Sequence, residues 1–440
     1  MPPENDEAPI AQAPWSPLLA GEEAQQAWSA VAELAARFAA ERPEAFLWHA
    51  NAQGVLPGAD LMSGGAGIAL FLATLSVVPD YEDSLGVALE YLDQSIGGIE
   101  KESLPPKLGF GYVGIGFAAQ MVGQLYPELE VGNLCEMIDR ALLRFLDQSE
   151  SLDARYTLLN GLVGIGIYAL ERRGAPAGTA LLERVIVRLT EMAERQPGGC
   201  TWYTPSHLIP VKPGSAPEPG RYNLGLAHGV PGVIGLLARS WAAGVERPRI
   251  EGCLAGAVRW LLAQELSGEP YALFPKWIIP GDEVESRRPA IPAWCYGEPS
   301  VAACLFLAGR ATGTAEWEAA GLRIARSCAQ RPMVGTSAVE AQFCHGAAGP
   351  AHILNLLFQS TGDPLLREGA LRYVRRILEA RADASQGFAG FQSQIWVGGP
   401  VWSGVPGLLE GAAGIGLVLL AAITSTAPLW DRCFGISGID

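Results

Sequence analysis

The stretch Gly161-Leu162-Val163-Gly164, with the apolar run IGIYAL (165–170) that follows it, decides the fold because the chain repeats its pattern. Six further segments have a glycine, two residues and a second small residue before an apolar run. They begin at Gly64, Gly111, Gly229, Gly297, Gly346 and Gly411. Successive leading glycines are 47, 50, 68, 68, 49 and 65 residues apart. Self-similarity at such a period indicates a repeat architecture.

Each repeat contains two kinds of helical segment. The run after each motif is apolar nearly all round, as in IALFLATL (68–75), which is typical of a buried helix. Between motifs lie amphipathic segments, such as MIDRALLRFL (137–146), whose charged residues mark a solvent-facing side. Period-2 alternation is nearly absent, so no sheet is expected. Each repeat therefore consists of one inner and one outer helix.

The apolar inner helices favour a closed ring, because an open array would expose one side of them to water. We predict an all-α (α/α)7 toroid formed by a single domain, residues 15–440, after a disordered tail, residues 1–14. The glycines at the starts of the inner helices are expected to let the seven backbones approach closely around the axis.

The charge of the chain argues against two classes of partner. Its 440 residues include 46 acids and 31 bases, for a net charge of −15, which repels nucleic acid and anionic membranes. The first residues, MPPENDEAPIAQAP, have no signal-peptide character. Residues 411–430 carry no charge, but the glycines and Thr-Ser-Thr-Ala-Pro predict a buried helix and a turn, not a membrane span. The eight cysteines lack the compact spacing of a disulfide scaffold. Reduced thiols and a cytoplasmic location are expected.

Two proline-rich insertions account for the two spacings of 68 residues. They cover residues 198–222 and 268–292. Their aromatic residues are Trp202, Tyr203, Phe274 and Trp277. Long segments of this kind are usually functional or disordered, and the aromatic residues predict ordered loops over one end of the ring. Contact with a peptide and simple packing both remain open.

Several histidine and cysteine residues occupy the same positions of the repeat, one or two residues before its leading glycine. The residues just before the leading glycines are Ser63, Phe110, Asn160, His228, Tyr296, His345 and Glu410. Those two before are Met62, Gly109, Leu159, Ala227, Cys295, Cys344 and Leu409. Equivalent register means equivalent height in a ring of equivalent repeats. We therefore expect His228, Cys295, Cys344 and His345 to gather at one end of the toroid. The remaining histidines, His49, His207 and His352, are interpreted as ordinary surface or core residues.

Two cysteines and one histidine suit zinc, and a site with three protein ligands keeps its fourth position for water or substrate. Cys344 and His345 are neighbours, so both can reach one ion only from an irregular turn before Gly346. Local CxxC and HExxH spacings are absent. The alternative is two buried structural thiols and a core histidine.

Four strings of the sequence resemble the signature blocks of the lanthionine synthetase C-like (LanC-like) cyclases, and the likeness covers essentially the whole chain. They are NLGLAHGVPG (223–232), AWCYGEPS (293–300), FCHGAAGP (343–350) and GLLEGAAGIGLVLL (407–420). The resemblance implies an α/α toroid with one zinc ion held by Cys295, Cys344 and His345, with His228 close by.

The resemblance also implies a reaction. Family members that make lanthipeptides add a peptide cysteine thiol to a dehydroalanine or dehydrobutyrine of the same peptide, forming a thioether ring. A cation favours the thiolate form of such a thiol, and the enolate formed by its attack needs a proton donor. His228 is the candidate, either as that acid or as the base that removes the thiol proton. A dehydrated precursor peptide is the implied substrate, and a separate dehydratase the implied partner.

Two positions depart from the family pattern. An aspartate often lies four residues before the third motif glycine, where this chain has Thr157; Asp153 or Asn160 could substitute. An arginine often lies four before the WC cysteine, where this chain has Ile291; the nearby arginines are Arg287 and Arg288. Tyr296 matches the pattern.

Two other classes of function stay open at this stage. A non-catalytic member would bind glutathione or thiol adducts through the same zinc site, or act as a scaffold. A glycosidase on an α/α barrel would need paired carboxylates near the mouth of the ring, but only Glu410 lies in the register.

Overall fold

The computed structural model describes residues 15–46, 58–148, 155–209, 216–268, 271–333, 340–396 and 399–438. The predicted tail, residues 1–14, lies outside these ranges, as do His49 and Asp153.

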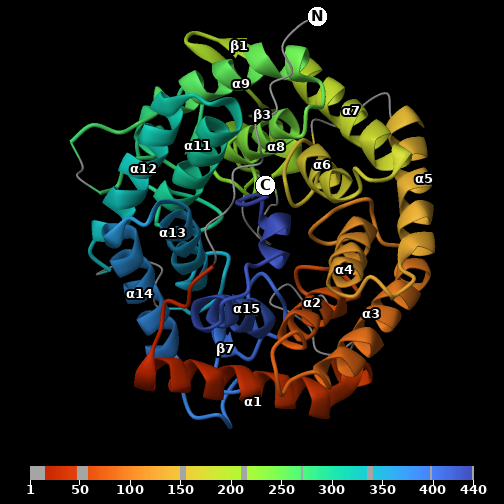
Figure 1. The fold of residues 1–440 in the computed structure, drawn as a ribbon. Helices are drawn as coiled ribbons and strands as arrows, with labels where there is room; N and C mark the ends of the chain where they lie inside the picture. The colour runs from red at the N-terminus through yellow and green to blue at the C-terminus, as the bar shows by residue number, and fades with distance from the viewer. Residues whose placement is uncertain are drawn as a thin grey trace, which may run out of the picture.

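The described chain forms two concentric rings of helices (Figure 1). The inner ring consists of α2 (Gly65–Leu75), α4 (Tyr112–Leu125), α6 (Leu162–Glu171), α8 (Val230–Ala242), α11 (Glu298–Thr312), α13 (Ala348–Thr361) and α15 (Ala412–Ile423). The outer ring consists of α1 (Gly21–Phe46), α3 (Ser84–Lys101), α5 (Gly132–Gln148), α7 (Pro176–Glu191), α9 (Arg247–Leu262), α12 (Ala315–Gln330) and α14 (Pro364–Glu379). Each inner helix contacts the next, and α15 contacts α2. The predicted α/α toroid is thus confirmed.

The N-terminal segment completes the last repeat, because α1 packs on α15. Trp15 Nε1 donates a hydrogen bond to the carbonyl of Ala421 at 2.8 Å, and Leu18 N–H donates to Ala422 at 2.8 Å. An ion pair between Glu23 and Arg375, 2.6 Å long, joins α1 to α14. The two ends of the chain therefore close the ring together.

A circle of backbone hydrogen bonds runs through the register two residues before the leading glycines. The bonds formed, each from N–H to carbonyl, are Met62 to Gly109, Gly109 to Leu159, Leu159 to Ala227, Cys295 to Cys344, Cys344 to Leu409 and Leu409 to Met62, at 2.9–3.5 Å. The circle is interrupted between Ala227 and Cys295, both within the described ranges. These bonds hold the seven loops at one height, as equivalent register predicts.

The two glycines of a motif have different roles. A Cβ atom on Gly111 would lie 2.0 Å from the carbonyl oxygen of Pro105, in the loop of the same repeat. A Cβ atom on Gly114 would lie 2.2 Å from the carbonyl oxygen of Leu108, in its own loop, and 2.6 Å from Cβ of Leu61, in the preceding repeat. The expected close approach between repeats therefore applies to the second glycine, which also packs against its own loop. It is wrong for the first, where the loop folds back on itself and leaves no room for a side chain.

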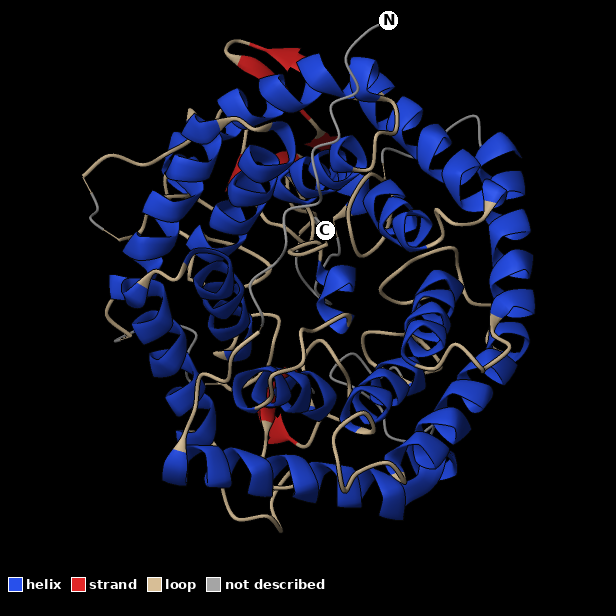
Figure 2. Cartoon of the chain, in the orientation of Figure 1, coloured by secondary structure: helices blue, strands red, loops and turns tan. Residues whose placement is uncertain are grey.

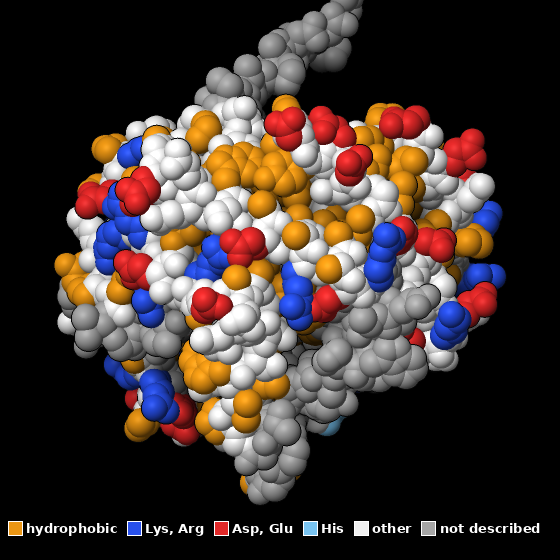
Figure 3. Space-filling view, turned by 90° about the horizontal axis from the view of Figure 1, so that it is seen from below, with side chains coloured by type: hydrophobic (Ala, Val, Ile, Leu, Met, Phe, Trp, Pro, Cys, Tyr) orange, Lys and Arg blue, Asp and Glu red, His pale blue; other side chains and the backbone are white. Residues whose placement is uncertain are grey.

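Helix α15 is buried along its whole length, as predicted, and a 3₁₀ helix, η2 (Trp430–Phe434), follows it. No helix in the described ranges is long and apolar enough to cross a membrane. The outer helices carry the charge: Figure 3 shows acidic and basic side chains interspersed over the face seen from below.

The expectation that the chain has no sheet is wrong in and next to the two insertions, and also in residues 393–403 before α15 (Figure 2). The strands are β1 (Glu194–Gln196), β2 (Gly199–Thr201), β3 (Tyr203–Thr204), β4 (Arg221–Asn223), β5 (Trp277–Ile278), β6 (Ser393–Trp396) and β7 (Pro400–Ser403). They pair antiparallel as β1-β2, β3-β4-β5 and β6-β7. The short helices η1 (Ser206–Leu208) and α10 (Glu283–Ser286) also belong to the insertions. Trp202 and Phe274 are fully buried, so these two aromatic residues serve packing.

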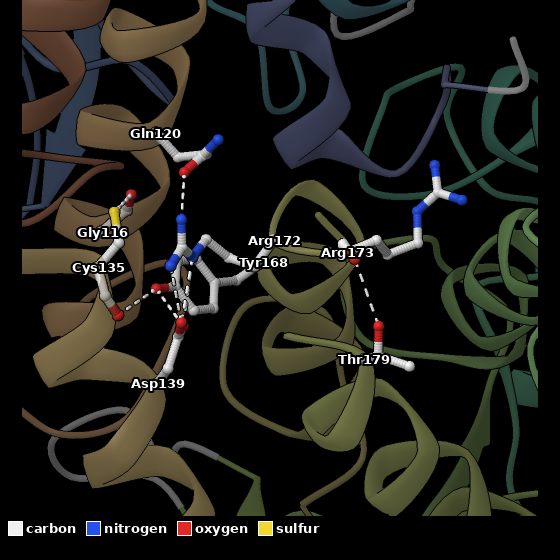
Figure 4. Close-up of polar contacts among 8 residues, drawn as sticks. All are labelled: Gly116, Gln120, Cys135, Asp139, Tyr168, Arg172, Arg173 and Thr179. Atoms are coloured by element: carbon white, nitrogen blue, oxygen red, sulfur yellow. Dashed lines mark hydrogen bonds and ion pairs between the residues drawn. The ribbon is translucent and has the colours of Figure 1, made fainter. Parts of the chain in front are cut away.

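A buried polar network joins three neighbouring helices (Figure 4). Asp139 of α5 forms an ion pair with Arg172, at the end of α6, at 2.9 Å, and it accepts a hydrogen bond from the Tyr168 hydroxyl at 2.7 Å. Arg172 also donates to Gln120 of α4 at 2.9 Å. Because a buried charge is stable only when it is paired, this network fixes how adjacent repeats pack.

The C-terminal segment fills the middle of the ring (Figure 1). Trp294 Nε1 donates to the carbonyl of Phe434 at 3.0 Å, and the ring of Phe343 stacks on that of Phe434 with centroids 4.0 Å apart. Arg432 pairs with Glu171 at 3.1 Å. Trp294 and Phe343 directly precede the two cysteines of the predicted site, so this segment anchors the loops that carry them.

Candidate metal centre

Three of the predicted site residues come together at the starts of α11 and α13. The sulfur atoms of Cys295 and Cys344 and a ring nitrogen of His345 all lie within 4.8 Å of one another. Both cysteines are buried and His345 is half-buried. Cys344 and His345 lie in a turn that ends before α13, as the sequence predicted, and this turn directs both side chains to one place.

The backbone fixes the two cysteines relative to each other. Cys295 N–H donates to the carbonyl of Cys344 at 3.1 Å, and Cys344 N–H donates to Leu409 at 2.9 Å. The positions of the two sulfurs therefore follow from the circle of hydrogen bonds between repeats.

Gln342 orients His345. Its side-chain oxygen accepts the backbone N–H of His345 at 3.1 Å, and its amide nitrogen lies 2.7 Å from Nε2 of the imidazole. Gln342 in turn contacts Glu340 at 3.4 Å, and Glu340 accepts the backbone N–H of Gln394 at 3.0 Å. An amide nitrogen can only donate, so Nε2 of His345 accepts the hydrogen bond from Gln342, and the two contacts of Gln342 together fix the backbone and the ring of His345. Sequence analysis missed Gln342 and Glu340; the only signal was that Gln342 lies one residue before the FCHG string.

The electrostatics of this cluster fit a cation. A hydrogen bond with Cys295 and burial raise the pKa of the Cys344 thiol well above its usual range. Two adjacent buried thiols thus resist joint ionisation unless a positive charge offsets them. Two thiolates and one imidazole are also a donor set that zinc accepts, with one position left open.

His228 and Tyr296 lie beside this cluster. Their rings are 6.3 Å apart between centroids, and Tyr296 directly follows Cys295. Asn223 Nδ2 donates to the Tyr296 hydroxyl at 3.2 Å. Desolvation and the positive charge of Arg221 lower the pKa of His228 to about 4, while burial raises that of Tyr296 to about 12. Both side chains are therefore neutral at neutral pH.

Arg221 is a site-lining residue that sequence analysis missed. It is buried at the start of β4, with its guanidinium 3.8 Å from the ring centroid of Trp277 and 2.7 Å from Glu218. Trp277 belongs to the other insertion, so the two insertions meet next to His228. The aromatic residues of the insertions predicted ordered loops over one end of the ring, but they did not indicate that the guanidinium of Arg221 would lie there.

The other predicted residues have different surroundings. Arg287 and Arg288 are exposed, and Arg288 pairs with Glu285 at 3.2 Å. Thr157 and Asn160 are half-buried. Glu410 is exposed but lies near the candidate ligands: desolvation and the nearby Glu340 raise the pKa of its carboxyl, the charge of His345 opposes this shift, and Glu410 in turn contributes to the raised pKa of Cys344. His207 is exposed and His352 is a core residue, 2.8 Å from Asp431, as the sequence predicted.

Comparison with solved structures supports the fold. A structure described as nisin cyclase aligns with a TM-score of 0.71 at 20% sequence identity, over 92% of this chain and 96% of that chain. A cellobiose 2-epimerase from Bacillus thermoamylovorans B4167 aligns with a TM-score of 0.43 at 9% identity, over 88% of this chain and 95% of that chain. The first of these two similarities shows the shared toroid.

Comparison with protein-family models identifies the family. The model described as lanthionine synthetase C-like protein matches residues 57–434, which include all seven glycine motifs and every residue of the candidate metal centre. The chain therefore belongs to the lanthionine synthetase C-like family.

Proposed function

We propose that the protein is a zinc-dependent lanthipeptide cyclase, which closes lanthionine or methyllanthionine rings in a dehydrated precursor peptide. The observation that carries this proposal is the cluster of Cys295, Cys344 and His345, with the neutral imidazole of His228 next to Tyr296, the residue that follows Cys295. Family membership and the toroid support it.

Cys295, Cys344 and His345 would hold the metal. When bound, a zinc ion supplies the positive charge that lowers the pKa of a substrate cysteine thiol and favours its nucleophilic form. Because two anionic thiolates offset the charge of the ion, this donor set suits thiol alkylation better than water activation.

His228 would carry the proton from the substrate thiol to the α-carbon of the dehydro residue. Its depressed pKa keeps the imidazole neutral, so it accepts the proton of the substrate thiol. The sulfur then forms a bond to the β-carbon of the dehydro residue, and the π electron pair moves toward the neighbouring carbonyl. The imidazolium returns its proton to the α-carbon. The same low pKa makes that imidazolium a strong acid, so one residue serves both steps and no atom is gained or lost.

Tyr296 and Arg221 would position this machinery. Tyr296, held by Asn223, packs beside His228, and Arg221 places a fixed positive charge near the imidazole. The insertions that carry Arg221 and Trp277 are the proposed contact surface for the peptide. A separate dehydratase is the proposed source of the dehydro residues, and the cytoplasm is the proposed compartment.

A thiol count tests the proposal, because cyclisation does not change the mass of the peptide. A dehydrated, cysteine-containing precursor is incubated with the zinc-loaded protein, separated, alkylated and weighed. Loss of alkylatable thiols is expected with the wild type. His228→Gln should keep its zinc and lower the rate by roughly 10²- to 10⁴-fold, the usual contribution of a general acid or base. Thiols that persist at the level of the enzyme-free control would favour a zinc protein that binds thiols without reacting them.

A further inference from the structure

Two cysteines outside the candidate metal centre, Cys200 and Cys253, lie side by side at the outside of the ring. Cys200 is in β2, and Cys253 is in α9, the outer helix on which β2 packs. Their sulfur atoms are 4.0 Å apart, and Cys200 Sγ lies 3.2 Å from the carbonyl oxygen of Cys253. Figure 1 shows the hairpin of β1 and β2 lying over α9.

Two glycines make this approach possible. A Cβ atom on Gly199 would lie 2.0 Å from the carbonyl oxygen of Gly256, and one on Gly256 would lie 3.0 Å from Cys200 Sγ. The strand therefore lies directly on the helix backbone, and a larger residue at either position would push Cys200 away from Cys253.

The pair is accessible from solvent on one side. Cys253 is half-buried, whereas the other seven cysteines, all within the described ranges, are buried. Cys200 has 8% of its surface exposed. A small reagent can thus reach one sulfur of the pair, and the second sulfur is next to it.

The surrounding charges favour a thiolate. Arg195 is paired directly with Cys200 in the hairpin, and Arg259 is on α9; both are exposed. The hydrogen bond with Cys253, followed by these two guanidinium groups, lowers the pKa of Cys200 although burial opposes the shift. The same hydrogen bond and burial raise the pKa of Cys253. Cys200 is therefore the sulfur of the pair that ionises more easily, and it lies next to the more accessible sulfur of Cys253, an arrangement suited to disulfide exchange.

We propose that Cys200 and Cys253 form a dithiol–disulfide site that reacts with low-molecular-weight disulfides such as oxidised glutathione. The accessible sulfur, that of Cys253, attacks the small disulfide, forms a mixed disulfide and releases one small thiolate. The other sulfur attacks the protein sulfur of this mixed disulfide, forms the bond between Cys200 and Cys253 and releases the second small thiolate. The two thiol protons pass to the two small thiolates. The protein pair is oxidised, and one small disulfide is reduced to two thiols.

The bond would tie the first insertion to the outer ring. Cys200 precedes β3 by three residues, and β3 pairs with β4, whose Asn223 contacts Tyr296. The crosslink therefore constrains the segment that leads to the candidate metal centre, without using any of its ligands.

The test uses full-length, zinc-loaded protein incubated with oxidised glutathione and then digested without reduction. A peptide pair joined through Cys200 and Cys253 is expected, with both unmodified peptides restored by reductant. Cys200→Ser should instead retain glutathione on Cys253, and Cys253→Ser should lose the crosslink. Cys328→Ser, which changes a buried thiol in α12, is the matched control and should still form it.

Two outcomes would overturn the proposal. One is wild-type protein without the Cys200–Cys253 peptide pair under conditions in which a model dithiol peptide is oxidised. The other is a glutathione adduct on Cys253 that is as stable in the wild type as in Cys200→Ser. Neither readout depends on cyclisation of a peptide, so this proposal and the proposed cyclase activity can fail independently.

Discussion

Cys295 donates its backbone N–H to the carbonyl of Cys344 at 3.1 Å, so two candidate zinc ligands from different repeats are joined by a hydrogen bond of the main chain. The sulfur positions are thereby tied to the circle of bonds that aligns the repeats. The hydrogen bonds that align these repeats therefore also join the loops that carry the candidate ligands.

Gln342 should tune metal affinity without being a ligand. Gln342→Ala removes the group that fixes the imidazole of His345, and loss of such a partner typically weakens metal binding about 10- to 100-fold. Competition with a chromogenic chelator measures this effect. Gln359→Ala, which changes an amide near the C-terminal end of α13 that bonds Ser16, is the control. Equal zinc affinities for wild type and Gln342→Ala would show that His345 does not depend on this contact.

The buried ion pair between Asp139 and Arg172 should contribute more to the free energy of unfolding than the exposed pair between Asp147 and Arg184. Asp139→Asn leaves the mostly buried guanidinium of Arg172 without its anion, and breaking such a pair costs about 3–5 kcal/mol of the free energy of unfolding. Asp147→Asn, which breaks the exposed pair with Arg184, should cost about 0–1 kcal/mol. Urea denaturation of both variants measures the difference. Similar costs would mean that the buried network of Figure 4 does not hold α5 against α6.

His228 should make stability depend on pH. Its pKa is lowered from 6.5 to about 4 in the folded chain, so the unfolded chain binds the extra proton between these values. Unfolding free energy should therefore fall as the pH drops from about 6.5 to about 4, and it should be unaffected by this residue above 6.5. Denaturation across that range should show a shallower fall for His228→Gln. A variant of the exposed His207, His207→Gln, is the control; identical slopes for wild type and His228→Gln would contradict the prediction.

Arg221 should account for part of the lowering of the pKa of His228. Desolvation is its main cause and the charge of Arg221 the second, so Arg221→Gln should raise the imidazole pKa only part of the way to 6.5. Titration by NMR of the histidine ring measures this pKa. Arg221→Lys keeps the positive charge and should keep most of the depression. If Arg221→Gln leaves the pKa unchanged, the guanidinium does not act on the imidazole.

The repeating part of the molecule was predictable, because each motif carries its own local signal. Glycine spacing predicted the seven inner helices, and the shared register predicted that His228, Cys295, Cys344 and His345 lie at one end of the toroid, where the last three form the cluster. The pairing of α1 with α15 was not predictable in this way, since it joins segments at opposite ends of the chain. Strands of two to four residues carry no measurable alternation, so the sheets were missed. Arg221 and the pair of Cys200 and Cys253 depend on how the insertions fold over the ring, which no motif encodes.

Metal analysis of the purified protein tests the central claim most directly. The account predicts one zinc ion per wild-type chain. It predicts loss of that ion in Cys295→Ala and Cys344→Ala, and its retention in His228→Gln and in the control Cys328→Ala. Full zinc content in either ligand variant, with the toroid intact by circular dichroism, would contradict the assignment of the site.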